Sequence, residues 1–526
     1  MLYVVQNWYI NSIILSVGGS GCFSTRIFVN IQKQESIHKG HEEVITMGIS
    51  REARWYALFL PSSWLSNVGH GLMVTVVGPT QPYLAKNVGV NIAVINLVWT
   101  FGFLGYIIGS LGTGFIFKRY LTNPKMKLAF LWITLSLNGV GMLILPFITN
   151  FGLLVTVRGL QYGLLGAYIT ADSSMLVYTM GPIKSRPFTN ALHACVGIGF
   201  LAATFLVRPF LPSEASALKN KDQVCFGNGT NVEDPLLTVD LQDEDAYLWG
   251  IQKIAWPFII SGIWCCVFSL GYLILGFLPL TMPIYYQPTN KQIEKDGHGS
   301  EMEQFGDEED SKPVGSKEIG PHHRSSQPRI RYWKQVLTLV FFYYAFSCGI
   351  ERIYQPMAYT FGLCGPLKLA PRDAVITDST YNGGFMTGRI VSVLLGGFVK
   401  PRNMIFASSG CCISASILLI AVGTSNKFGL YIGTAILGFF VSWQFGSCYS
   451  WISQKGDITG RISPIFFLGC GFGSSIFPPL SGFVFNSALG PMGILYLTLM
   501  ATLCQFVIYA TMWALSRAKP TQMVIK

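Results

Sequence analysis

Residues 92–119 read IAVINLVWTFGFLGYIIGSLGTGFIFKR and contain no charged side chain before Lys118 and Arg119. An α-helix needs about 20 mainly apolar residues to cross the hydrocarbon core of a bilayer, and this run is long enough. Basic residues directly after such a run are typical of the cytoplasmic end of a membrane helix. The stretch therefore predicts a transmembrane helix.

Similar apolar runs recur along the whole chain. Because one span follows another with short connections, the sequence predicts an all-α integral membrane protein with about twelve transmembrane helices. We place the spans at 56–79, 92–117, 127–148, 151–178, 188–210, 255–279, 334–357, 379–399, 403–423, 428–452, 462–485 and 491–515.

The composition agrees with a membrane location. Hydrophobic residues make up 51% of the chain and charged residues only 12%, whereas about 25% of an ordinary soluble protein is charged. The formal net charge of +11 could indicate nucleic-acid binding. However, the Lys and Arg residues lie in short groups between apolar runs, so we expect a lipid bilayer as partner and no nucleic acid.

The connections between spans predict the orientation. Alternate loops are basic, with Lys118 and Arg119 in one and Lys400 and Arg402 in another, so we expect both termini in the cytoplasm. The loop at 211–254 is acidic and falls outside, and it holds the only Asn-x-Ser/Thr sequence, at Asn228, which we expect to be glycosylated. Two cysteines, Cys225 and Cys364, lie in the predicted outer loops, and we hypothesise a disulfide between them.

A polar segment divides the spans into six and six. Residues 281–331 are rich in acidic residues and lack the apolar residues of a core, which predicts a disordered cytoplasmic linker. The second and eighth spans both end in Gly-Phe before a basic turn, at Leu111–Arg119 and Leu395–Arg402. This weak repeat indicates two parallel six-helix halves.

The predicted organisation follows from this division. An N-terminal cytoplasmic segment precedes the first half, and it contains an apolar stretch that is either interfacial or upstream of a working start at Met47. The parts are the N-terminal segment at 1–54, the first six-helix half at 55–280, the linker at 281–331, the second six-helix half at 332–516 and a cytoplasmic tail at 517–526.

Ionisable side chains inside membrane helices are costly, so each needs a role. We expect five of them to act in ion coupling or gating: Arg158, Asp172, His193, Glu351 and Arg389. Depth along the helices suggests an outer pair of Arg158 with Glu351 and an inner pair of Asp172 with His193. Alternatively, Arg352 satisfies Glu351 locally, and His193, like His70, is only hydrogen-bonded to its own surroundings.

Amide and aromatic side chains in the spans are compatible with a bound polar solute. Amides can donate to and accept from hydroxyl groups, and aromatic faces can pack on the C–H surface of a sugar ring. The candidate binding residues are Asn67, Gln161, Tyr343, Tyr344, Gln355, Asn382, Trp443 and Gln444.

Glycines line one face of the second span at Gly102, Gly105, Gly109 and Gly112, and the eleventh span holds Gly469, Gly471 and Gly473. Such faces allow close helix approach, either for static packing or for movement of one half against the other.

No phosphate loop, zinc motif or nucleophile elbow stands out, so we expect no enzymatic activity, no metal site and no cofactor other than sodium as a coupling ion.

Short motifs in several spans resemble one known family. They are Val77-Gly78-Pro79-Thr80, Ala191-Leu192-His193 with Gly197 and Gly199, Gly349-Ile350-Glu351 with Tyr359 and Phe361, Gly388-Arg389, Lys400-Pro401, Gly433-Thr434 with Leu437-Gly438, and Asp457-Ile458-Thr459-Gly460. The chain is similar in these residues to the sodium-dependent glucose transporter-like branch of the major facilitator superfamily.

The resemblance implies a secondary transporter that works by alternating access of two six-helix halves. It further implies a monosaccharide, most simply glucose, that enters by sodium symport across the plasma membrane. Three other functions stay open at this point: proton-coupled or facilitative transport of another organic solute, transport of an anion, and solute binding by a receptor that does not transport.

Overall fold

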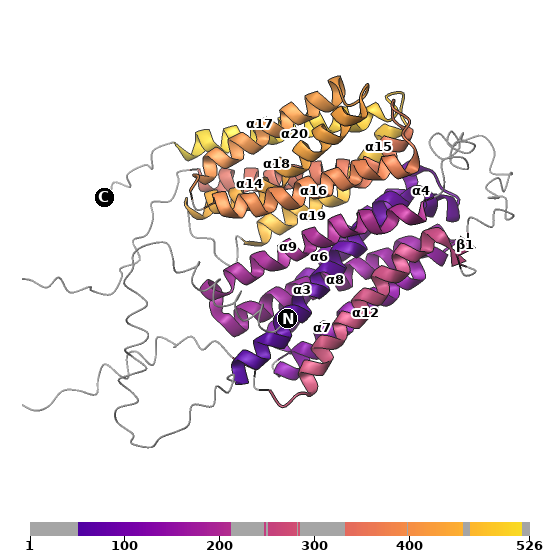
Figure 1. Ribbon diagram of the computed structural model, residues 1–526. Coiled ribbons are helices and arrows are strands. Elements are labelled where there is room, and N and C mark those ends of the chain that lie inside the picture. Colours follow the sequence, from indigo (N-terminus) through magenta and orange to yellow (C-terminus); the bar gives the residue numbers. More distant parts are fainter. Residues whose placement is uncertain are drawn as a thin grey trace, which may run out of the picture. The chain divides into compact units, whose positions relative to one another are not determined.

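The computed structural model describes residues 51–121, 123–211, 247–248, 251–280, 282–283, 332–396, 398–455 and 463–517. This part of the chain is almost entirely helical (Figure 1). Its only strands in the described ranges, β1 (Tyr247–Leu248) and β2 (Ile251–Gln252), pair antiparallel. The predicted glycosylation site Asn228 lies outside the described residues, and so do the predicted linker and both predicted tails, apart from residues 51–54, 282–283 and Arg517.

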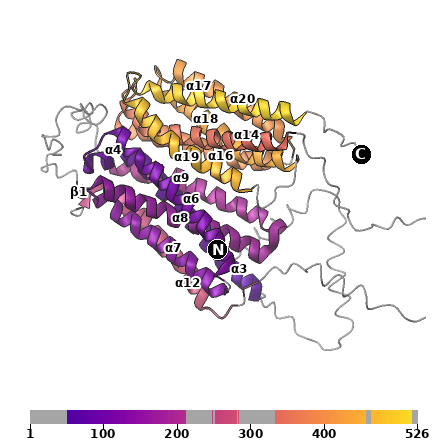
Figure 2. The same ribbon diagram turned by 180° about the vertical axis from the view of Figure 1, so that it is seen from behind.

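Twelve described helices have 21 or more residues, and they form two groups of six that are separate in Figures 1 and 2. Within the described residues, nine spans meet the length and apolarity expected of a membrane-crossing helix. The first half holds α3 (Arg51–Thr75), α6 (Leu97–Arg119), α7 (Pro124–Ile144), α8 (Phe151–Lys184), α9 (Arg186–Val207) and α12 (Trp256–Phe277). The second half holds α14 (Trp333–Tyr354), α16 (Pro371–Leu395), α17 (Pro401–Ala421), α18 (Lys427–Ser453), α19 (Ser463–Phe485) and α20 (Met492–Ser516).

The two halves repeat one packing scheme. In the first half α3 packs on α9, α6 on α8 and α7 on α12; in the second half α14 packs on α19, α16 on α18 and α17 on α20. The partners occupy the same positions in the order of the six helices. This supports the parallel repeat that the Gly-Phe endings predict.

Local sequence sets where several helices begin. The Asn123 side chain accepts a hydrogen bond from the Lys125 backbone N–H, and Pro124 is the first residue of α7. Asn426 caps α18 in the same way, through the N–H of Phe428. An Asn cap satisfies a backbone donor that the helix itself leaves free, and proline at the first position loses nothing.

The first helix of each half is broken near one end. Helix α3 ends at Thr75 and continues as α4 (Val77–Asn87), whose third residue is Pro79. Helix α14 ends at Tyr354, and a 3-10 turn (Gln355–Met357) with Pro356 leads into α15 (Ala358–Cys364). Because proline lacks an N–H, it interrupts the helical hydrogen bonds at both places. We call the end of the helices where α4 and α15 lie the α4 side, and the opposite end the Arg51 side.

The glycine faces pack mainly within each half. A Cβ on Gly105 or Gly109 of α6 would meet the backbone of α8 at Gly159 or Gly163. Gly469 and Gly473 of α19 lie in the same way against the backbone of α14. Static packing is therefore the main use of these faces, and the exception is Gly471, which contacts Ile107 of the other half.

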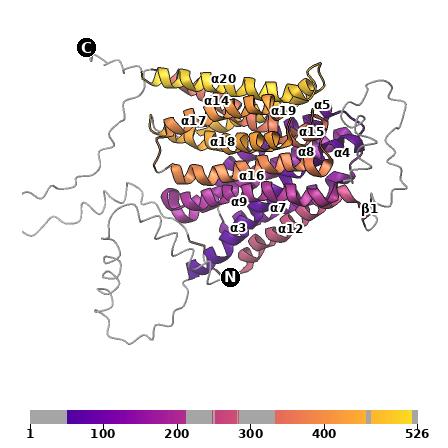
Figure 3. The same cartoon turned by 45° about the horizontal axis from the view of Figure 1, so that its top comes forward.

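The two halves meet through α9 with α16 and through α6 with α19; Figure 3 shows α9 and α16 side by side. Four hydrogen bonds in the described ranges join the halves, and all lie toward the α4 side or the middle of the helices. They run from Gln355 to Thr75, between the Tyr83 and Tyr359 hydroxyls, from Asn96 to Met357 and from Thr100 to the backbone of Ser475. The structure is therefore a state closed on the α4 side.

Candidate functional site

Five ionisable side chains from both halves face one another, and we call them the charged cluster. They are His70 of α3, His193 of α9, Glu351 and Arg352 of α14, and Arg389 of α16. Arg389 interacts electrostatically with His193, Glu351 and Arg352. His70 interacts in the same way with His193 and Arg352. Four helices thus bring their charged groups to one place.

Within the charged cluster, one cation is compensated and one is not. Arg352 Nη2 lies 2.8 Å from Glu351 Oε1, so these two side chains form an ion pair, the local alternative considered for Glu351. The guanidinium of Arg389 lies 5.0 Å from the centroid of the Phe385 ring. In the part of the chain that the structure describes, it has neither a hydrogen-bond acceptor nor a carboxylate within ion-pair distance, although Glu351 attracts it from further away. Its N–H groups are therefore available to a ligand.

The His193 side chain is exposed although it lies inside α9. Its electrostatic contact with Arg389 of the other half places it between the halves rather than toward lipid. It is the eighth residue of a helix that begins on the Arg51 side, so it lies about 10 Å from that end. The charged cluster is therefore open toward the Arg51 side while the halves are closed on the α4 side.

A row of polar side chains links the charged cluster to the closed side. It consists of the Gln355 and Asn382 amides and the Thr75 hydroxyl, and we call these three side chains the amide chain. Arg352 Nη1 donates to Gln355 Oε1 at 2.8 Å. Gln355 Nε2 lies 3.4 Å from Asn382 Oδ1 and 3.5 Å from Thr75 Oγ1 of the first half. Two of the predicted binding residues, Gln355 and Asn382, thus lie at the contact between the halves.

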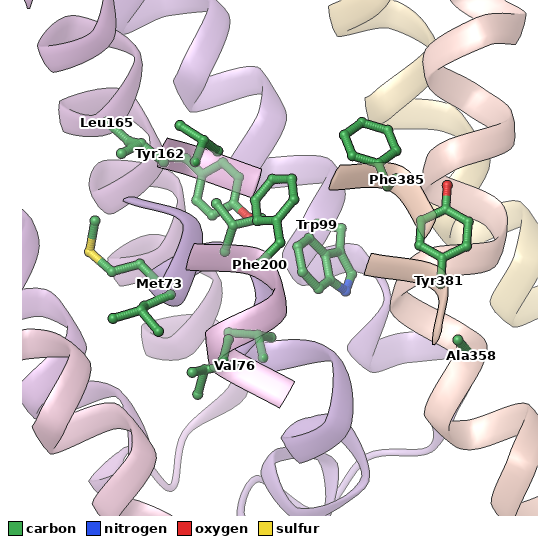
Figure 4. Close-up of a cluster of buried hydrophobic side chains, with 14 of the residues drawn as sticks. Met73, Val76, Trp99, Tyr162, Leu165, Phe200, Ala358, Tyr381 and Phe385 are labelled. Atoms are coloured by element: carbon green, nitrogen blue, oxygen red, sulfur yellow. The ribbon is translucent and has the colours of Figure 1, made fainter. Parts of the chain in front are cut away.

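Aromatic rings lie at the contact between the halves, and Figure 4 labels several of them. Phe200 of α9 and Phe385 of α16 face each other across the halves with ring centroids 6.2 Å apart. Tyr381 stacks beside Phe385 at 6.3 Å. The Arg352 guanidinium lies 4.9 Å from the Phe103 ring of the first half. Charged donors, amides and ring faces together are the groups that bind a small polar molecule with an apolar face.

The predicted outer pair of Arg158 with Glu351 is wrong. Arg158 is 1% exposed and bonds within its own half, from Nη1 to Gln161 Oε1 at 2.6 Å and from Nη2 to the Tyr162 hydroxyl at 3.3 Å. Gln161 also donates to the backbone of Asn138. Packing of α8 against the other helices of its half turns this face inward. Arg158 and Gln161 therefore form their hydrogen bonds within the first half, although Tyr162 also interacts electrostatically with Arg352 of the charged cluster.

The predicted inner pair of Asp172 with His193 is also wrong. The Asp172 carboxylate accepts from Ser63 Oγ at 2.7 Å, from Asn67 Nδ2 at 2.9 Å and from the Tyr272 hydroxyl at 3.2 Å. Its donors come from α3 and α12, because α8 directs Asp172 into the core of the first half. Asp172 and the predicted binding residue Asn67 thus form a satisfied buried cluster.

The remaining predicted binding residues lie in the second half. Gln444 Oε1 accepts from Gln505 Nε2 at 2.9 Å, and the Tyr344 hydroxyl donates to the backbone of Phe445. Tyr343 is fully buried in a core shared with Tyr344, and Trp443 packs on the rings of Phe439 and Phe440. All of these contacts lie within the second half.

Two functional candidates are absent from the sequence-based selection. Arg352 was considered only as a partner for Glu351, yet it also contacts Gln355 and Phe103. Asp378 of α16 is 1% exposed and was not selected. It precedes the predicted span at 379–399 by one residue, whereas α16 begins at Pro371. A longer window over this polar start of the helix would have included the carboxylate.

One half of the disulfide hypothesis lies in the described residues. Cys364, the last residue of α15, is disulfide-bonded. Cys225, its predicted partner, lies outside the described residues. The pairing of these two cysteines stays a prediction.

A family model described as Major Facilitator Superfamily matches residues 63–478. Human sodium-dependent glucose transporter 1 is 23% identical over 454 residues, which cover 86% of this chain and 78% of that protein. Major facilitator superfamily domain-containing protein 4A of Xenopus tropicalis is 22% identical over 442 residues, covering 81% of this chain and 85% of its own length.

Solved structures share the fold. The E. coli fucose:proton symporter has a TM-score of 0.51 at 16% identity, covering 87% of this chain and 98% of the symporter. A bacterial homologue of the human lysosomal transporter Spinster, in an inward-facing and occupied conformation, has a TM-score of 0.58 at 12% identity, covering 88% and 96%.

Proposed function

Because the chain belongs to the Major Facilitator Superfamily, a non-enzymatic family of multi-pass membrane transporters, we propose that it carries a hexose such as glucose by sodium symport. The name of the human relative supports the sugar and the ion, and the family and fold support transport itself. The single observation that carries the proposal is the position of the charged cluster and the amide chain between the halves. A solute bound there would contact both halves and move from one side to the other as they rock.

Donors and ring faces at this place suit a sugar. Arg389 offers unused N–H groups, and Gln355 and Asn382 offer amides whose hydrogen bond to each other is long, at 3.4 Å. Long hydrogen bonds are easily exchanged for bonds to a ligand hydroxyl. The Phe200 and Phe385 rings provide apolar faces for the C–H surface of the sugar. We assign the sugar contacts to this group of side chains.

Access to the site follows from the state described. The four hydrogen bonds between halves close the α4 side, and His193 is open toward the Arg51 side. The basic loops predict that the Arg51 side is cytoplasmic. In this proposal the structure is the inward-open state, and the solute enters from outside after the α4 side opens.

The plasma membrane is the location we propose for this transporter. The Asn228 sequence and the predicted disulfide of Cys225 with Cys364 both require an oxidising, glycosylating route to the cell surface. Cell-surface biotinylation and a shift in gel mobility after deglycosylation would test the location. Labelling confined to internal membranes would contradict it.

Uptake into proteoliposomes tests the function. The purified full chain should accumulate a labelled, non-metabolised glucose analogue faster with sodium outside than with choline. Arg389→Gln removes charged hydrogen bonds worth about 1.5–3 kcal/mol, so we expect KM to rise roughly 10- to 100-fold. Arg402→Gln is the matched control, because Arg402 is an exposed arginine at the start of the next helix. An unchanged KM in Arg389→Gln would contradict the assigned site.

An organic anion is the second candidate substrate. It is favoured by one observation: among the described residues, Arg389 forms no close ion pair or hydrogen bond with a carboxylate, because the Glu351 carboxylate is paired with Arg352. Competition separates the two candidates: unlabelled hexoses should inhibit uptake if the sugar is the substrate. Inhibition only by small carboxylates or phosphates, with no sugar uptake in either buffer, would replace the sugar by an anion.

A further inference from the structure

Asp378 is a carboxylate buried within the second half. It is the eighth residue of α16 and lies about 10 Å from the start of that helix on the α4 side. Its side chain is 1% exposed. The position is therefore inside the membrane-spanning bundle, where an ionised carboxylate has no access to bulk water.

The Asp378 carboxylate has one hydrogen-bond donor, and that donor is shared with a second acceptor. Asn382 Nδ2 lies 3.1 Å from Oδ1, and the same nitrogen also lies 3.0 Å from the backbone carbonyl oxygen of Asp378. The second carboxylate oxygen, Oδ2, is buried without a hydrogen-bond partner. Half of the hydrogen-bonding capacity of the group is thus unused within the described residues.

The other two carboxylates in the middle of the bundle are satisfied in different ways. Asp172 accepts three hydrogen bonds, and Glu351 is paired with Arg352 at 2.8 Å. In the described ranges no Lys, Arg or His forms an ion pair with Asp378. An isolated buried charge costs several kcal/mol, so the resting carboxylate needs a neutralising cation or a proton.

Oxygen atoms without partners lie on the same stretch of helix. The hydroxyl groups of Thr377 and Tyr381, next to Asp378 and one turn beyond it, are buried without partners. Tyr354 interacts electrostatically with Asp378, and its hydroxyl lies 2.6 Å from the hydroxyl of Thr434. Carboxylate and hydroxyl oxygens suit a hard cation, whereas no group of three metal-binding His, Cys, Asp or Glu residues is present in the part described.

The amide chain connects Asp378 to the contact between the halves. Asn382 donates to Asp378 and accepts from Gln355, which in turn reaches Thr75 of the first half. Gln355 also accepts from Arg352 of the charged cluster. Each amide in this row has its orientation set by its neighbours, and the carboxylate is the terminal acceptor. A change of charge at Asp378 would therefore alter the hydrogen bonds that hold the halves together.

From this arrangement we infer that Asp378 binds the coupling cation, a sodium ion or a proton, and that the amide chain transmits its occupancy to the interface between the halves. The inference rests on the proposed function, because it supplies the cation site of that transport cycle. It assigns the coupling role to a residue of the second half. Asp172 and Glu351, which have partners within the bundle, then have a structural role.

A cation titration tests the site without any sugar. The thermal unfolding midpoint Tm of the purified full chain is measured while sodium chloride replaces choline chloride at constant ionic strength, and then across pH in choline alone. A ligand that binds only the folded protein raises Tm in a saturable way. Saturation with sodium identifies sodium, and a rise only on lowering the pH identifies the proton.

Variants show which residue is responsible for the Tm response to the cation. Asp378→Asn should fold and should lose the Tm response to both cations, because its neutral amide imitates the occupied carboxyl. Asp378→Glu should keep a response with weaker affinity. Asp373→Asn, which removes the same charge in the first turn of the same helix, should respond like the wild type. A wild type without any response, or Asp378→Asn with the full response, would overturn the inference.

Transport distinguishes this inference from the proposed function. In proteoliposomes, Asp378→Asn should still exchange labelled for unlabelled glucose analogue, because both exchange steps use the occupied state, but should lose accumulation driven by a cation gradient. Absence of sugar uptake in the wild type would contradict the proposed substrate, while the Tm titration would still decide the cation site.

Discussion

Ionisable side chains in this bundle are accommodated in three ways. Arg158 is surrounded by neutral acceptors and lies 4.6 Å from the Tyr162 ring centroid. Asp172 is enclosed by hydroxyl and amide donors, and Glu351 is neutralised by Arg352. Because the Arg158 Nη atoms and the two carboxylates have partners within the bundle, and only the Arg158 Nε is left without one, these groups stabilise the bundle without needing a ligand. Arg389 and the Asp378 carboxylate of α16 remain as the ionisable groups that are available to a ligand.

Substitution at Asp172 should reveal a structural role. Asp172→Leu leaves the donors of Ser63, Asn67 and Tyr272 buried without their acceptor, at about 1–3 kcal/mol each. We expect a clearly lower Tm in detergent for Asp172→Leu and a smaller decrease for Asp172→Asn, which keeps one acceptor oxygen. The cation response of Asp172→Asn should resemble that of the wild type. An unchanged Tm in Asp172→Leu would show that the cluster contributes little.

Partners that are adjacent in the sequence could be predicted, and partners on other helices could not. The neighbourhood of Glu351 and Arg352 indicated a local pair, and the structure contains it. The proposed partners of Arg158 and Asp172 were chosen by depth alone. Depth gives the position along a helix, but the direction of a side chain depends on how the helix rotates when it packs. Rotation of α8 is set by its contact with α6, which one sequence does not reveal.

Elements of secondary structure follow the sequence closely in the apolar middle of each span and less closely at its ends. The predicted span at 151–178 continues as α8 up to Lys184, past Gly181 with its φ of 78°. The span at 56–79 divides into α3 and α4, and the span at 334–357 consists of α14 and the 3-10 turn at Gln355–Met357, after which α15 begins at Ala358. Hydropathy detects the apolar core of a span, but it does not register breaks or polar first turns.

The packing of α6 on α8 can be tested with a matched pair of glycines. A Cβ at Gly109 would meet the backbone of Gly163, whereas a Cβ at Gly112, one turn further on, meets nothing within 4 Å. Replacing glycine by alanine inside a helix otherwise favours folding by about 1 kcal/mol. We therefore expect Gly109→Ala to lower Tm and Gly112→Ala to leave it unchanged or raise it. Equal effects at both positions would contradict the close approach.

At the scale of the whole molecule, two similar halves are joined through a small number of polar contacts. The family and fold are those that the motifs of the sequence indicated, and the match spans residues 63–478. The two halves repeat one packing scheme, as the Gly-Phe sequences predict, although Gly114 and Phe115 lie within α6 whereas Phe398 lies beyond the end of α16. The substrate could not be predicted in this way, because it depends on a few side chains at the interface.

A disulfide across the interface should stop the transport cycle. An added Cβ at Gly197 of α9 would lie 3.6 Å from the Cβ of Met386 in α16, within the range of about 3.5–4.5 Å for a disulfide. In the double variant Gly197→Cys with Met386→Cys, oxidation should abolish uptake and reduction should restore it. Each single variant under oxidant is the control. Full uptake after verified cross-linking would show that these helices do not separate during transport.

The four hydrogen bonds that close the α4 side must break in each transport cycle, so their strength determines the free energy needed to open that side. A net contribution of about 1 kcal/mol for each bond gives roughly 4 kcal/mol for breaking all of them. One monovalent ion that crosses a potential of about 100 mV releases about 2.3 kcal/mol, before its concentration gradient is added. The free energy needed to break these bonds is thus of the same order as the electrochemical energy of a single ion. The contacts on the closed side are therefore weak enough to break at every turnover.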